Sequence, residues 1–168
     1  MFRSRYSLLA LLACTTCLLL STPAVLRAEE EQPLIDILKS DSAKPEKAIA
    51  CKKLAVWGSA DAVPALAALL PDPELSSWAR IALEAIPDDA AAAALRDAMK
   101  VVEGRTLAGV INSLGVREDN AAVDQLITFS TDSDEVVASA ALAALGRIGN
   151  EPATAALRKA LSEAPEKL

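Results

Sequence analysis

The sequence predicts an all-α solenoid built from about four and a half helix–turn–helix repeats. The first observation is a recurring pair of anchor leucines twelve residues apart, at Leu54/Leu66, Leu83/Leu95, Leu114/Leu126 and Leu145/Leu157. The first leucines of successive pairs lie 29, 31 and 31 residues apart, a period typical of stacked repeats. The second is composition. The 168-residue chain is 52% hydrophobic but only 3% aromatic, which favours closely packed Ala- and Leu-rich helices over a sheet.

The first 28 residues have the pattern of a secretory signal. Arg3 and Arg5 precede the apolar run Leu8–Leu20, and small residues then lead into a run of glutamates. The run has 13 residues, whereas a membrane-spanning helix needs about 20. We therefore expect cleavage, after Ala28 or alternatively after Ala24, and a bacterial protein exported to the periplasm or the medium.

Charge and cysteine content limit the partners of the mature chain. Removal of residues 1–28 takes away three of 17 basic residues and none of the 23 acidic residues, which leaves a net charge of −9. An acidic chain repels phosphate backbones, so nucleic acid is not an expected partner. Cleavage would leave Cys51 as a lone cysteine, free or modified, without an internal disulfide. A lipoprotein with Cys14 lipidated remains an alternative.

The mature chain divides into an end cap, four repeats and a tail. Residues 29–44 are predicted to form a polar lead-in and a short capping helix, with Pro33 in its first turn, that covers the open end of the array. The tail, residues 162–168, is charged and expected to be mobile. The repeats are expected at about 45–74, 75–104, 105–133 and 134–161.

Each repeat carries its own start and stop signals. Relative to the first anchor leucine, the first helix has apolar residues at −5, −4, −1, 0 and +3, which is one face of an α-helix. Breakers are expected to end these helices, with the glycines in the left-handed conformation: Gly58, Pro87, Gly115 and Gly149. Acids and amides are expected to cap the helices that follow: Asp61, Asp88, Asp89, Asp119, Asn120, Asn150 and Glu151.

The third repeat departs from this pattern. Gly109 lies inside its first helix, where glycine costs about 1 kcal/mol relative to alanine. Arg117 and Glu118 stand where the other copies carry an apolar residue and a breaker. We therefore expect the third repeat to be the least stable.

Three stretches resemble one class of helical repeat. The segment ALGRIGNEPA, residues 144–153, resembles the short HEAT-like repeats of the phycobilisome-lyase type, and Gly58–Leu66 and Trp78–Ile86 match neighbouring parts of the same pattern. The resemblance extends over about residues 33–161. It implies a right-handed α-solenoid of HEAT-like repeats that acts as a protein-binding scaffold, with the second helices lining its concave surface.

The residues favour binding over catalysis. The chain contains no histidine, the commonest general base and metal ligand, and it has no glycine-rich phosphate loop. We therefore expect no enzyme activity, no cofactor and no metal. The expected ligand is another protein or peptide, bound by a monomer that makes no membrane contact after signal cleavage. The candidate binding residues on the concave face are Arg96, Asp97, Lys100, Asp124, Thr128, Arg158 and Lys159.

Three other functions remain open. The resemblance allows a chaperone-like lyase factor of the bilin-lyase type or an accessory subunit, and the repeat architecture allows a purely structural module that stacks on other repeats. The expected lack of a catalytic base favours the scaffold.

Overall fold

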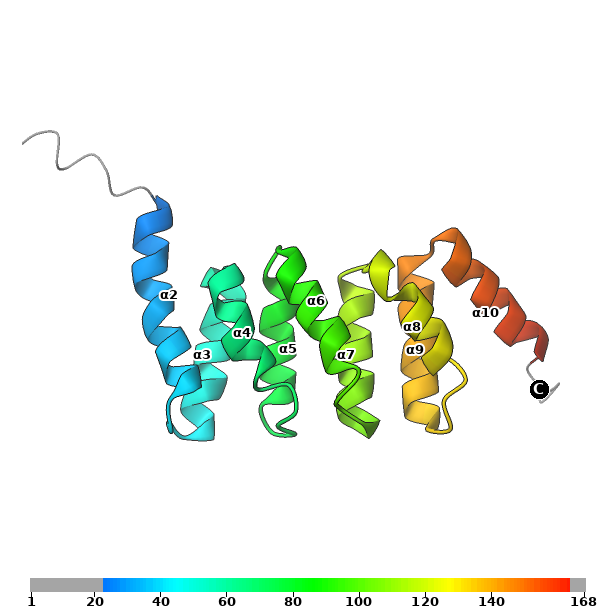
Figure 1. Cartoon of the computed structure of the whole chain (residues 1–168), viewed down its shortest axis with the longest axis horizontal. Helices are drawn as coiled ribbons and strands as arrows, with labels where there is room; N and C mark the ends of the chain where they lie inside the picture. The colour runs from blue at the N-terminus through cyan, green and yellow to red at the C-terminus, as the bar shows by residue number, and fades with distance from the viewer. Residues whose placement is uncertain (1–22, 164–168) are drawn as a thin grey trace, which may run out of the picture.

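The structure is a computed structural model that describes residues 23–163, and this part of the chain contains helices and turns without a strand. The predicted all-α solenoid is confirmed (Figure 1). Four helix pairs follow an N-terminal helix, with a 3₁₀ turn before two of the second helices. In chain order the elements are α2 Pro23–Lys39, α3 Lys44–Trp57, η1 Ala60–Ala62, α4 Val63–Ala67, α5 Ser76–Ala85, α6 Asp89–Ala98, α7 Gly104–Val116, η2 Asn120–Ala122, α8 Val123–Phe129, α9 Glu135–Ile148 and α10 Glu151–Glu163.

The helices stack in two layers. The first helices of the repeats, α3, α5, α7 and α9, stand side by side, and the second helices, α4, α6, α8 and α10, form the other layer (Figure 1). Helix α2 packs on α3 and α4 at one end of the array, while α10 packs on α8 and α9 at the other. The two ends of the described chain therefore lie at opposite ends of the stack.

The anchor leucines form the centre of a continuous core. Seven of the eight have no solvent exposure, and the eighth, Leu157, is partly buried against the core. Leu157 belongs to α10, the last helix, which has no following repeat to cover it. One repeat buries its apolar stripe only against its neighbours, as expected for a solenoid.

The predicted buried face of the first helices is wrong at its edge. The −4 residues Ala50 and Ala79 are buried, but the −5 residues Ile49 and Trp78 are 55% and 42% exposed. Position −5 lies about 140° around the helix from the anchor leucine, which places it at the border of the buried face. Trp57, at the end of α3, is likewise 51% exposed rather than buried.

The N-terminal cap is longer than predicted. Helix α2 runs from Pro23 to Lys39, so Pro33 lies inside it rather than in its first turn, and the expected polar lead-in is helical. The array accounts for this difference. Glu31 is only 4% exposed, and its carboxylate accepts a 2.6 Å hydrogen bond from the backbone N–H of Ser59 in the first repeat. That contact favours helical structure upstream of Pro33.

The glycines act less uniformly than expected. Gly149 ends α9 in the left-handed conformation, with φ 64°, as predicted. Gly58 is extended after α3, with φ −65° and ψ 149°, and Gly115 lies inside α7, which ends at Val116. In the third repeat the positive φ of 50° falls on Glu118 instead.

Three of the predicted capping residues accept hydrogen bonds at helix starts, and in the first repeat another residue replaces the predicted one. The side chains of Asp88 and Asp119 accept hydrogen bonds from backbone N–H groups at the starts of α6 and η2. Asn150 Oδ1 likewise accepts a 3.0 Å bond from the N–H of Ala153 in α10. In the first repeat Ser59 is the cap, because its hydroxyl accepts a 3.2 Å hydrogen bond from the backbone N–H of Asp61. Asp61 itself was the predicted cap.

Two glycines in the third repeat have packing roles. A Cβ on Gly115 would lie 2.8 Å from Ala144 Cα, so α7 and α9 approach too closely for a side chain there. A Cβ on Gly109 would lie 3.0 Å from Arg80 Nε, because the Arg80 side chain crosses that position. The departure at Gly109 therefore makes room for a neighbouring repeat.

Candidate protein-binding face

The predicted binding residues lie on three second helices. Asp97 and Lys100, at the end of α6, are exposed and paired with each other at 2.7 Å. Asp124 and Thr128 are exposed on α8, where the Thr128 hydroxyl donates a 3.2 Å hydrogen bond to the backbone carbonyl of Asp124. Arg158 and Lys159 are exposed on α10. These six side chains belong to one layer but come from three successive repeats, two from each.

Arg96 differs from the other predicted binding residues because it forms an ion pair with the next repeat. Its guanidinium donates to the carboxylate of Asp119 in the next repeat, and the side chains are only 26% and 12% exposed. Asp119 also caps η2, so this ion pair connects α6 to the start of the following second helix. Arg96 is thus engaged within the array.

An apolar groove separates α4 from α6. It encloses about 510 Å³, and ten of the eleven residues that line it are apolar. The single charged lining residue is Asp97. The other ten are Val63, Pro64, Ala67, Leu70, Pro71, Ala90, Ala93, Ala94, Ala98 and Val101. The sequence did not identify this groove, because its walls come from two repeats and consist largely of alanine, which carries no chemical signal.

Two further clefts are polar. One, of about 460 Å³, lies between α6 and η2, where Arg96, Arg117, Glu118 and Asp119 contribute to its walls. The other, of about 500 Å³, lies between the loop before α7 and the loop before α9. Ion pairs and backbone hydrogen bonds already engage several of these polar groups. The α4–α6 groove is the most apolar of the three.

Arg117 fixes one repeat to the next. Its Nη1 donates to the backbone carbonyls of Leu83, Glu84 and Ile86, at 2.8, 3.1 and 2.6 Å, and its Nη2 donates to that of Asp88 at 2.9 Å. These carbonyls belong to the last turn of α5 and the turn after it, where a cation also complements the helix dipole. Arg117, which departs from the repeat pattern in the third repeat, therefore caps the C-terminus of α5 in the second repeat.

Other polar contacts also join residues about one repeat apart. The Ser113 hydroxyl is fully buried and donates to Glu84 Oε1 at 2.5 Å, while Arg80 Nη1 lies 3.3 Å from the same oxygen. Asn150 Nδ2 donates to Asn120 Oδ1 at 2.8 Å. Polar residues separated by 28 to 34 positions were the sequence signal that could have revealed these contacts.

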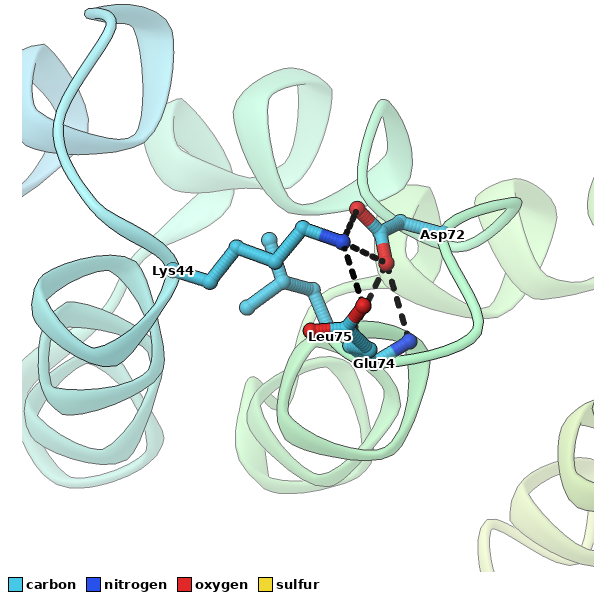
Figure 2. A network of polar contacts seen from close by, with 4 residues as sticks. All are labelled: Lys44, Asp72, Glu74 and Leu75. Atoms are coloured by element: carbon cyan, nitrogen blue, oxygen red, sulfur yellow. Dashed lines mark hydrogen bonds and ion pairs between the residues drawn. The ribbon is translucent and has the colours of Figure 1, made fainter.

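A further contact fixes the start of the array (Figure 2). Lys44 Nζ, at the first residue of α3, lies 3.1 Å from Asp72 Oδ2 and 3.0 Å from Glu74 Oε1 in the loop before α5. Asp72 Oδ1 also accepts hydrogen bonds from the backbone N–H groups of Glu74 and Leu75. Hydrogen bonds to these carboxylates raise the pKa of Lys44, and hydrogen bonds from the Glu74 backbone and Lys44 lower the pKa of Asp72.

Cys51 is a core residue. It has no solvent exposure on α3, and burial raises the pKa of its thiol from 9.0 to about 11. The thiolate is the nucleophile and the metal ligand, so a thiol that stays protonated at neutral pH suits neither role. Among residues 23–163 no group of three histidine, cysteine, aspartate or glutamate side chains could hold a metal ion.

The family model of HEAT repeats matches residues 31–107 and 103–168, which together span most of the chain. The protein belongs to the HEAT repeat family. The match confirms the resemblance at the level of the family and does not distinguish the phycobilisome-lyase type. No curated protein matches the chain.

HEAT repeats commonly mediate protein–protein interaction, and the family is typically a non-catalytic scaffold. Within this HEAT array the Arg96–Asp119 ion pair and the Asn150–Asn120 hydrogen bond connect the second-helix layer of successive repeats. In the described part of the chain no helix is long and apolar enough to cross a membrane.

Proposed function

We propose that this HEAT-repeat protein is an exported, monomeric, non-enzymatic scaffold that binds another protein through its second-helix layer. The observation that carries the proposal is the open surface between the second helices. An apolar groove of about 510 Å³ lies between α4 and α6, and a polar cleft of about 460 Å³ lies between α6 and η2, which the Arg96–Asp119 ion pair connects. A preorganised surface binds with a smaller entropic cost than a flexible one.

The chemistry of the chain supports a non-enzymatic role. The sequence contains no histidine, and burial keeps the thiol of Cys51 protonated. The carboxylates at the helix starts have structural roles, since Asp88, Asp119 and Asp134 each accept a hydrogen bond from a backbone N–H group.

Export is compatible with the packing of α2. Cleavage after Ala28 would retain Glu31 and its bond to Ser59, together with the buried Leu34, Ile35 and Leu38. The signal itself, residues 1–22 for the greater part, lies outside the described residues. N-terminal sequencing of the protein from fractionated cells tests this step. A start at Glu29 or Val25 in the exported fraction is expected, and an intact Met1 in the cytoplasm contradicts it.

Photo-cross-linking tests the binding face. A photoreactive amino acid replaces Thr128 on α8 in one variant and Ala143 on α9 in another, both of which are exposed. We expect a discrete cross-linked protein from the α8 position in cells of the source organism and none from α9. Cross-links from the α9 position alone would contradict the proposed face.

A further inference from the structure

The groove between α4 and α6 has the form of a binding site for a helix. We propose that it binds a basic amphipathic helix of a partner protein. This inference rests on the proposed scaffold function and specifies the form and charge of the bound segment.

The walls of the groove favour a helix over an extended peptide. They come mainly from helical residues, whose backbone N–H and C=O groups already bond within α4 and α6. An extended peptide would find few free main-chain partners there, whereas a helix satisfies its own backbone. The ten residues of α6 form one wall about 15 Å long, which can lie beside about three turns of a bound helix.

The alanines set the depth of the groove. Ala67, Ala90, Ala93 and Ala94 contribute only a methyl group each to its surface. Small side chains at a helix contact permit an interaxial distance at the short end of the usual range of about 8–10 Å. The bound helix can therefore insert Leu- or Met-sized side chains between α4 and α6.

The charge of the second layer favours a basic partner. Within this layer η1, α4 and α6 carry three carboxylates, Asp61, Asp89 and Asp97, and one basic residue, Arg96, which Asp119 already engages. Over the whole array the second helices with their 3₁₀ turns hold six acidic and three basic residues, whereas the first helices hold three acidic and seven basic ones. Electrostatic complementarity of this kind selects partners and speeds association.

Asp97 places an acidic charge in the apolar wall of the groove. Among the described residues it is the only charged one in the wall of the apolar groove. It pairs with Lys100, and the two side chains are 73% and 61% exposed. Such an exposed ion pair contributes little to the stability of the fold. An arginine or lysine of the bound helix can therefore compete with Lys100 for this carboxylate.

The test uses labelled synthetic peptides and the protein purified after expression of the full chain. The probes are a 16-residue helix with leucine and alanine on one face and lysine on the other, the same peptide with glutamate in place of lysine, and a scrambled lysine peptide of equal composition. Fluorescence anisotropy gives the affinities. We expect the lysine helix to bind at least tenfold more tightly than either control peptide.

Two substitutions at equivalent positions locate the binding. Ala93→Trp fills the groove, whereas Ala155→Trp adds the same side chain two residues before the second anchor leucine of the last repeat. We expect Ala93→Trp to weaken binding at least tenfold and Ala155→Trp less than twofold, with unchanged circular dichroism for both. Equal weakening by the two variants, or equal binding of the scrambled peptide, overturns the inference.

A charge reversal gives an independent readout. Asp97→Lys, at an exposed position, is expected to reverse the preference between the lysine and glutamate helices, and an unchanged preference overturns the assignment of a basic partner. If light scattering shows a dimer and Ala93→Trp dissociates it, a second copy of the chain occupies the groove. That result also overturns the inference of a partner helix. If cross-linking from α8 captures a partner but the peptides fail to bind, the groove inference fails while the scaffold function stands.

Discussion

Replacement of Arg117 by alanine tests whether contacts between repeats stabilise the array. Arg117 Nη1 donates to three carbonyls but carries only two N–H groups, and Nη2 donates to a fourth carbonyl. The guanidinium therefore supplies about three effective hydrogen bonds, each with a net value of about 1 kcal/mol. Its Nε is buried and has no hydrogen-bond partner among residues 23–163, which offsets about 1 kcal/mol of that stabilisation.

We expect Arg117→Ala to lower the free energy of unfolding by about 2 kcal/mol. For a chain of this size that corresponds to a fall in Tm of about 6 °C. Urea titration followed by circular dichroism measures the loss. Hydrogen exchange locates it, with faster exchange expected in the last turn of α5.

Two matched variants test the mechanism. Arg117→Lys keeps the charge but loses the planar fork of donors, so a loss of about 1 kcal/mol is expected. Arg105→Ala removes an exposed arginine at the start of the same helix and should change stability by no more than about 0.5 kcal/mol. The reasoning is refuted if Arg117→Ala destabilises the protein no more than Arg105→Ala does.

Three further predictions concern packing and titration. Gly115→Ala should lower the free energy of unfolding by about 1–3 kcal/mol, because its Cβ would meet the Ala144 backbone at 2.8 Å. Gly109→Ala should be nearly neutral, because the flexible Arg80 side chain can move aside. Chemical denaturation of the two variants compares them. Cys51 should resist thiol reagents until the protein unfolds, and stability should fall as pH rises from 9 towards 11, because burial favours the protonated thiol; Cys51→Ala should remove that part of the slope. The contribution of Asp72, whose pKa is lowered in the fold, is present above its unfolded pKa and should disappear as pH falls through the folded value, a loss that Asp72→Asn abolishes in acid titration.

The expected weakness of the third repeat has lost its physical basis. Gly109 accommodates Arg80, and Arg117 caps α5, so both departures from the repeat pattern have compensating contacts. Gly115 further allows the close approach of α7 and α9. We now expect the amides of α7 to be among the best protected in hydrogen exchange, and protection below that of α3 would contradict this.

The exposed residues of the first helices show where pattern reading failed. Ile49 and Trp78 fit an apolar helical stripe as well as Ala140 does, yet only Ala140 is buried. A periodicity defines a face of the helix but not its width. The width depends on how closely the neighbouring helices approach, which is a property of the stack.

The sequence by itself determined the helical class, the repeat, the anchor leucines and most of the capping residues, because each depends on local spacing and backbone chemistry. The tertiary structure alone decided the role of Arg117, the engagement of Arg96 by Asp119 and the groove between α4 and α6. These features join residues of different repeats across the stack. Their geometry depends on the packing of neighbouring helices, which a single repeat does not encode.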